Sequence, residues 1–241
     1  MFGEIKNSRS ERLDYTFHAG DPASRNLVVL GHGVTGNKDR PFIIALASGL
    51  AAAGLPVLRV SFSGNGASGG RFVDSHITKE VADLGAVLDA LAGRTGCYVG
   101  HSMGGAVGVV RASQDARIHL LVSLAGMVHT RAFAHREFGQ VTPDVGNMWD
   151  DPACPLSKAY MDDLTRLDSV VNLAPHIKVP WLFVHGTEDD VVPMQDTLDI
   201  FAAANEPKEF IDLPGSGHIF SGDFTPVMVD RVVGWIKARL K

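Results

Sequence analysis

Long uncharged apolar runs and blocks of lysine or arginine are both missing from this sequence. No apolar run reaches the roughly 18 residues of a membrane-spanning helix, and the first thirty residues mix charges in a way that a secretory signal does not. The formal charge of −5 lacks the positive field that nucleic-acid binding needs. Two cysteines, Cys97 and Cys154, cannot build a disulfide framework. We therefore expect a cytoplasmic protein that acts on a small molecule and binds neither nucleic acid nor membrane.

What the sequence does contain, from Asn26 onward, is an alternation of short β-rich runs with helical periods. This alternation predicts an α/β fold in which helices cover both faces of a mostly parallel sheet. The 241 residues, 45% of them hydrophobic, favour one large domain over residues 1–241. An antiparallel pair, 4–6 and 12–18, is expected at the sheet edge. The continuous β runs, expected to be buried on both faces, are 27–30, 57–62, 97–100, 120–124, 181–184 and 209–213, and the expected helices are 41–53, 76–91, 103–113, 194–204 and 226–240.

One stretch, at about 127–178, breaks this rhythm because it has no strand-like run. A loop that long in a compact domain usually carries short helices of its own or a function. We interpret it as an inserted cap. Its large aromatic residues, which are costly to leave exposed, either line a pocket or anchor the cap: Phe133, Phe138, Trp149 and Tyr160.

The sharpest motif is Gly100-His101-Ser102-Met103-Gly104, directly after an expected strand and directly before an expected helix. A G-x-S-x-G sequence in that setting is typical of a nucleophile elbow, a tight turn that exposes the serine hydroxyl. The glycines leave room for neighbouring backbone. Ser102 is therefore the candidate nucleophile.

A serine hydroxyl needs a general base, and the base needs an acid that orients it. Among ten histidines, His218 follows the last expected strand after a Gly-Ser-Gly approach, so we expect it to be the base. The adjacent acids Glu188, Asp189 and Asp190 follow another strand at the same edge of the sheet. A loop can point only one or two of these acids at a histidine.

An oxyanion that forms during acyl transfer needs preset backbone donors. Met103, directly after the nucleophile, offers its N–H at a helix start. A second donor is expected from the glycine-rich loop after the first parallel strand, with Val34 the best candidate and Gly33 next. Gly33 is also a candidate substrate-binding position.

With these motifs in place, the chain resembles the α/β-hydrolase superfamily over essentially its whole length. The sequences H-G-V-T-G-N-K at 32–38, S-F-S-G-N-G at 61–66, G-H-S-M-G-G at 100–105 and H-G-T-E-D-D-V-V-P at 185–193 are similar to those of small bacterial cinnamoyl and feruloyl esterases and of serine aminopeptidase-type hydrolases. The resemblance implies about eight strands, a short helical cap after the sixth, and Asp189 as the acid.

The resemblance also implies a serine esterase that cleaves carboxylic esters of short to medium acyl chain, including hydroxycinnamates, through an acyl-enzyme. No cofactor is expected, and no histidine spacing such as H-E-x-x-H suggests a metal. The alternatives are a thioesterase or a peptidase on the same residues, a peptidase using the pairs 150–151 or 162–163 to capture an amine, and a non-catalytic binding protein. The oligomeric state is open between monomer and homodimer.

Overall fold

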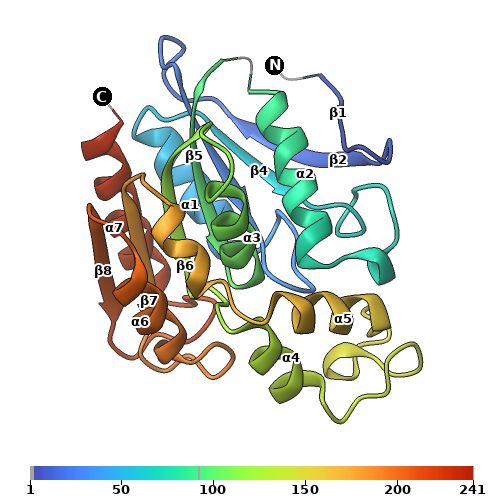
Figure 1. The fold of residues 1–241 in the computed structure, drawn as a ribbon. Coiled ribbons are helices and arrows are strands. Elements are labelled where there is room, and N and C mark those ends of the chain that lie inside the picture. The colour runs from blue at the N-terminus through green and yellow to red at the C-terminus, as the bar shows by residue number, and fades with distance from the viewer. Residues whose placement is uncertain (1–2, 92, 241) are drawn as a thin grey trace.

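The computed structural model of the chain describes residues 3–91 and 93–240, and within these ranges eight strands form one sheet. Their order is β1-β2-β4-β3-β5-β6-β7-β8, with the pairs β1–β2 and β2–β4 antiparallel and the remaining pairs parallel (Figure 1). The predicted fold class and the antiparallel edge pair are therefore confirmed. The strands are β1 (Ile5–Lys6), β2 (Arg12–His18), β3 (Asn26–Gly31), β4 (Val57–Ser61), β5 (Thr95–His101), β6 (Ile118–Leu124), β7 (Trp181–Gly186) and β8 (Lys208–Leu213).

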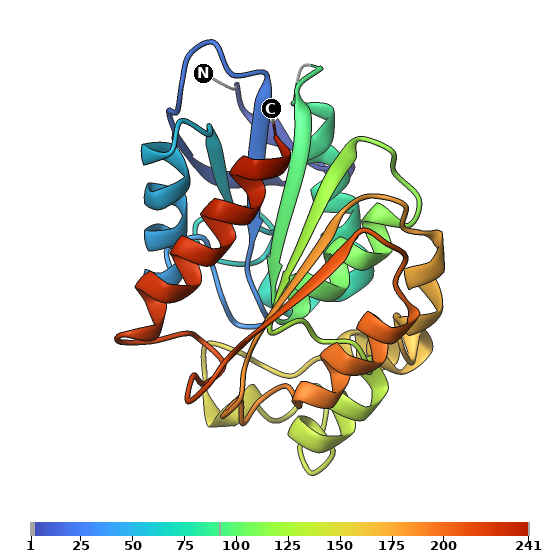
Figure 2. The ribbon, with the colours of Figure 1, turned by 90° about the vertical axis from the view of Figure 1, so that its left-hand side faces the viewer.

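Two hydrophobic clusters, one on each face of the sheet, form the core. Successive side chains of a strand point to opposite faces, so Leu27 and Val29 belong to one cluster, while Val28 and Leu30 belong to the other. Figure 2 shows α1 and α7 on one side of the sheet and α3 on the other. The helices are α1 (Pro41–Ala52), α2 (Ile77–Asp89), α3 (Met103–Ala112), α6 (Met194–Ala203) and α7 (Phe224–Arg239), with a short 3₁₀ turn η1 (Phe72–Asp74) before α2.

Local sequence signals determine where several helices begin. Pro41 occupies the first position of α1, where a missing N–H has no cost. The ring of His76 accepts a hydrogen bond from the Lys79 N–H and caps α2. The first residue of α3 follows Ser102 directly, so β5 and α3 are joined by a single residue. The last of these junctions is the one at which the nucleophile Ser102 was expected.

The last strand differs from its prediction. The run 209–213 was expected to be buried on both faces, yet in β8 only Leu213 is buried, and the other positions are half-buried or exposed. The strand lies at the edge of the sheet and pairs with β7 alone. An edge strand has a neighbour on one side only, which explains its exposure.

Short helices fill the segment between β6 and β7, where a cap was expected, and they lie below the carboxyl ends of the parallel strands in Figure 1. Thr130 donates its hydroxyl to the Leu164 carbonyl at 2.8 Å, which ties two of these helices together. Asp163 accepts hydrogen bonds from the backbone N–H and hydroxyl of Thr78 and so fastens the cap to α2. The cap elements are α4 (Thr130–Phe138), η2 (Met148–Asp150), α5 (Lys158–Leu167) and η3 (Val171–His176).

A buried polar group lies on α2 where it faces the cap. Both carboxyl oxygens of Glu80 are buried without a hydrogen-bond partner among the described residues, and the Tyr160 hydroxyl is in the same condition. Burial, and next the charge of Asp83, raise the pKa of Glu80 well above its usual value, although Lys79 opposes the shift. The folded protein therefore favours the neutral form of the Glu80 carboxyl.

We predict that Glu80→Gln stabilises the protein at high pH. A carboxyl whose pKa is raised on folding contributes most below its unfolded pKa of 4.5, and that contribution is lost as pH rises through the folded value. Glutamine stays neutral, so the free energy of unfolding of the variant should increasingly exceed that of the wild type from about pH 4.5 to pH 8. Urea unfolding at several pH values measures the difference. Glu4→Gln, at an exposed position, is the matched control, and an equal gain at every pH would contradict the prediction.

Candidate active site

The predicted nucleophile Ser102 lies in the strained turn that the motif indicated. Its backbone has φ 53° and ψ −120°, a conformation that non-glycine residues rarely adopt. The turn is held from both sides: the Ser102 N–H donates to the Leu124 carbonyl at 3.0 Å, and its own carbonyl accepts from Gly105 and Met127. Strain of this kind, fixed by surrounding backbone, is typical of a nucleophile elbow.

Glycine is required on both sides of this turn because backbone packs against backbone. A Cβ atom at Gly100 would collide with the Gly104 carbonyl, and a Cβ at Gly104 would lie 2.5 Å from the carbonyl oxygen of His32. Real Cβ atoms essentially never approach that closely. The two motif glycines therefore bring β5, α3 and the loop after β3 into direct contact.

Asp189 and His218 meet across the ends of β7 and β8. His218 donates its Nδ1–H to Asp189 Oδ2 at 2.8 Å, and Asp189 Oδ1 accepts the backbone N–H groups of Val191 and Val192 at 2.9 and 2.8 Å. Burial alone would raise the pKa of Asp189, but hydrogen bonds from His185 and His218 outweigh it and hold that pKa well below its usual range. Asp189 is thus a buried carboxylate aimed at the ring of His218.

The neighbouring acids do not share this position. The Asp189 side chain is only 1% exposed, whereas Glu188 and Asp190 are exposed residues. Of the three adjacent acids, the structure therefore brings Asp189 to His218, as the family spacing implied.

His101 supports the His218 loop from below. Its Nε2–H donates to the His218 carbonyl at 2.9 Å, and the two rings lie 4.6 Å apart between centroids. Burial, and next the charge of His218, lower the pKa of His101 to about 3, so the ring is neutral at ordinary pH. The sequence motif contained His101 but gave no sign of this contact with a residue far along the chain.

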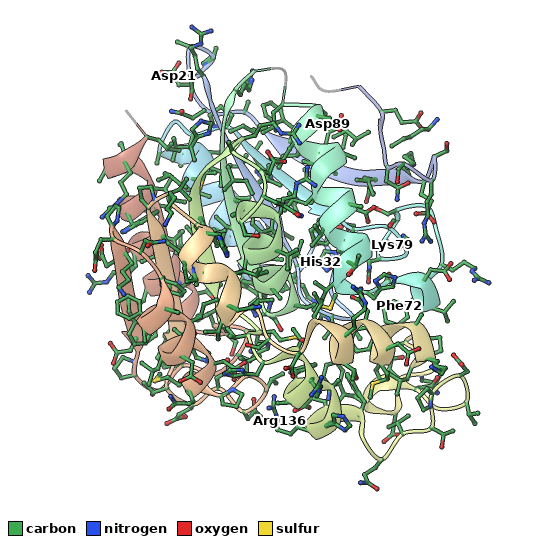
Figure 3. The ribbon with its side chains drawn as sticks, viewed as in Figure 1. Asp21, His32, Phe72, Lys79, Asp89 and Arg136 are labelled. Carbon is green, nitrogen blue, oxygen red and sulfur yellow. The ribbon has the colours of Figure 1, made fainter. Side chains whose placement is uncertain are left out.

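The expected oxyanion loop follows β3 and turns around a buried histidine. His32 donates Nδ1–H to the Gly33 carbonyl at 2.8 Å and accepts the Phe62 N–H on Nε2 at 3.0 Å. Burial lowers the pKa of His32 to about 4, so the neutral ring can fill both roles. Figure 3 labels His32 near the middle of the molecule, above the cap. Within the described chain, no backbone carbonyl accepts the N–H of Val34 or of Met103.

These parts surround one cavity of about 340 Å³. Ser102 and His218 line it, and so do Gly33 and Val34 from the loop after β3. Its volume lies within the range of small-molecule sites. Of the two expected oxyanion donors, Val34 lines this cavity and Met103 does not, although Met103 directly follows Ser102. A hydroxyl, a carboxylate-bound imidazole and a free backbone N–H around one cavity are components of nucleophilic acyl transfer.

The four cap aromatics divide between two positions. Trp149 lines the cavity and is 45% exposed. Phe133, Phe138 and Tyr160, which are also candidate substrate-binding residues, are buried and do not line it, so of the two alternatives left open by the sequence their positions favour anchoring of the cap. The ring of Phe138 packs edge-on against those of Trp149, Phe133 and Tyr160, with centroids 4.9, 6.0 and 6.0 Å away. Phe138 and its two buried neighbours anchor the cap and support Trp149.

The acidic pairs considered for amine capture lie elsewhere. Asp162 pairs with Lys158, and Asp163 is buried against Thr78 and Arg166. Neither these residues nor the pair 150–151 lines the cavity. Across residues 3–91 and 93–240, no three His, Cys, Asp or Glu side chains are placed to hold a metal ion, and no helix is both long and apolar enough to cross a membrane.

The comparison with family models gives one match, to the prolyl oligopeptidase family, over residues 45–241. Among curated proteins, the uncharacterized protein YfhR of Salmonella typhi is 36% identical over 88 residues, which is 36% of this chain and 30% of that protein. An uncharacterized protein of Mycobacterium tuberculosis is 28% identical over 193 residues, 75% of this chain and 59% of that protein. The chain thus spans less than two thirds of the length of these relatives.

Several solved structures have the same fold. Est1E from Butyrivibrio proteoclasticus with ferulic acid bound has a TM-score of 0.86 at 21% identity and covers 97% of each chain. The esterase domain of a Rhodothermus marinus protein has a TM-score of 0.78 at 21% identity, over 99% of this chain and 98% of that one. A monoacylglycerol lipase of Paleococcus ferrophilus has a TM-score of 0.75 at 21% identity, over 94% and 98%. The predicted α/β-hydrolase fold is confirmed.

Proposed function

The chain belongs to the prolyl oligopeptidase family, and from this premise we propose that it is a serine esterase that cleaves carboxylic esters of short to medium acyl chain. The observation that carries the proposal is that Ser102, in its strained turn, and His218, held by Asp189, line the same cavity. No cofactor enters the reaction that follows.

In the proposed reaction, Ser102 Oγ attacks the ester carbonyl while His218 Nε2 takes the hydroxyl proton. Asp189 holds the ring through Nδ1 and stabilises its charged form. The N–H groups of Val34 and Met103 bind the oxyanion of the tetrahedral intermediate. His218 then protonates the departing alcohol, leaving an acyl-enzyme. A water molecule, deprotonated by His218, attacks that acyl group. The bond between the acyl carbon and Ser102 Oγ then breaks as His218 returns the proton to Oγ, which releases the acid and free Ser102.

The charge around the cavity weighs against an aminopeptidase. Such an enzyme needs a carboxylate to capture the free amine of its substrate, and no Asp or Glu among the described residues lines this cavity. The family description nevertheless supports a peptidase as the second candidate.

Hydroxycinnamate esters enter the proposal because Est1E, a protein of the same fold, is described with ferulic acid bound. The free, buried Cys97 and Cys154 fit the reducing cytoplasm.

We predict that Ser102→Ala lowers hydrolysis of 4-nitrophenyl esters by at least about 10⁴-fold, because it removes the nucleophile. Spectrophotometric assays give the rate, and circular dichroism with thermal unfolding checks that the variant is folded. Wild-type activity in a folded Ser102→Ala protein would rule out the proposed nucleophile.

Asp189→Asn should reduce kcat by about 10³–10⁴-fold, since an asparagine cannot stabilise the charged imidazole. The matched control is Asp190→Asn, which makes the same chemical change one residue further along at an exposed position. Kinetics of both variants on one ester measure the contrast. A larger loss at position 190 than at 189 would overturn the assignment of the acid.

A substrate panel separates the two candidate functions. We expect turnover of 4-nitrophenyl acetate and its homologues up to laurate, with a maximum at short to medium chains, and turnover of methyl ferulate if aromatic acids fit. A thioester and an aminoacyl 4-nitroanilide complete the panel. Turnover of the anilide alone would replace the esterase with a peptidase.

A further inference from the structure

We propose that Arg40 is a specificity residue that binds a carboxylate carried by the substrate, so that the preferred substrates are esters with a free anionic group near the scissile bond. This inference rests on the proposed esterase function and names its substrate class. Arg40 has no part in the proposed steps of ester cleavage.

Arg40 belongs to the same cavity as the reacting groups. It lines that cavity together with Ser102 and His218, directly before the first turn of α1. Its Nη2 donates to the Thr35 carbonyl at 3.0 Å, and Thr35 itself lines the cavity in the loop that carries Val34. This hydrogen bond holds the guanidinium beside the expected oxyanion donors.

The charge of Arg40 has no counter-charge there. Within the described parts of the chain, Arg40 is in no ion pair, whereas its neighbours Lys38 and Arg59 both pair with Asp39. No acidic residue lines the cavity, and Arg40 is its only arginine or lysine among the described residues. The protein as a whole has a formal charge of −5, whereas the cavity that holds the nucleophile has an unpaired positive charge.

The surroundings strengthen the positive potential. The first turn of α1 contains no acidic residue, and its N-terminal backbone dipoles point toward Arg40. Burial is the main cause of the low pKa of His32, and the charge of Arg40 lowers it further, so the charge acts inside this wall. Arg40 is itself an exposed residue, so solvent screens part of its charge, while apolar Phe42 and Ile43 line the cavity beside it.

The geometry of a guanidinium fits a carboxylate. Arginine has five N–H donors in a planar fork, and the structure gives one of them to Thr35. The others can form paired hydrogen bonds to the two oxygens of a carboxylate. A free amine in the same place would meet like charge, which also weighs against capture of a peptide N-terminus.

Two matched substrate pairs locate the anionic group. On the acyl side, 4-nitrophenyl hydrogen adipate is compared with 4-nitrophenyl hexanoate, whose acyl chain has the same number of carbons. On the alcohol side, 4-acetoxybenzoate is compared with the neutral 4-acetoxybenzamide. The measured quantity is the ratio of kcat/KM for the anionic ester to kcat/KM for its neutral partner. We expect the wild-type ratio to favour the anion in one of the two pairs and to fall as salt is added.

The variants are Arg40→Gln, Arg40→Lys and, as the matched control, Arg25→Gln. Arg25 is exposed and directly precedes β3. Asp21, in the turn before it, lies at the end of the molecule opposite Arg136 of the cap, so the control position is far from the cap (Figure 3). Arg40→Gln should lower the favoured ratio by about fivefold, the upper end of what an ion pair at an exposed position contributes. Arg40→Lys should retain part of the preference, and Arg25→Gln all of it.

A binding measurement separates failure of this inference from failure of the esterase proposal. In the Ser102→Ala background, calorimetry compares monomethyl adipate with methyl hexanoate, and Arg40→Gln is added to the same background. Tighter binding of the anion that Arg40→Gln abolishes supports the inference even if no ester is turned over. The same calorimetry compares 4-acetoxybenzoate with 4-acetoxybenzamide for the alcohol side. Equal ratios in wild type and Arg40→Gln for both substrate pairs, or no binding preference in either pair, would overturn the inference while leaving turnover of neutral esters intact.

Discussion

The close packing of backbone on backbone at the turn after β5 is the constraint from which the rest of the site follows. Gly100 and Gly104 allow the start of α3 to touch the loop after β3, and hydrogen bonds from both directions hold Ser102 at φ 53°. The strain is maintained because the turn is part of the sheet and cannot relax alone. A hydroxyl presented in this way reaches groups from strands far apart in the sequence.

The site combines two histidine rings that are neutral with one carboxylate that is charged. The rings of His32 and His101 are buried and neutral, and each uses a specific tautomer to hold a loop. Asp189 is ionised because its hydrogen bonds offset the cost of burial. His218 is the one histidine of the three that meets both the carboxylate and the cavity. The surrounding histidines thus position the base without competing for its proton.

The sequence predicted the parts of this protein that depend on local patterns. Continuous β runs and helical periods located the sheet, and the strand ends marked Ser102, His218 and the acids at 188–190, of which the family resemblance singled out Asp189. Local patterns could not predict which cap aromatics are buried. The cap is irregular, so its four aromatic residues follow no helical or strand period that would distinguish Trp149, which lines the cavity, from buried Phe138. The exposure of β8 depends on sheet order, which strand sequences alone do not specify.

Arg40 shows why site chemistry needs the folded structure. In the sequence it lies among charged residues of both signs, and only the fold separates it from them: Asp39 turns to Lys38 and Arg59, while Arg40 turns to Thr35 and the cavity. Position 40 also precedes the segment 45–241 that the family model matches. The elbow, acid and base lie within that segment, whereas the loop with Val34 and Arg40 does not. The proposed nucleophile, acid and base therefore lie in the matched segment, while Arg40 of the proposed substrate contact and Val34, an expected oxyanion donor, lie before it, so the proposed preference for an anion can change while Ser102, Asp189 and His218 are kept.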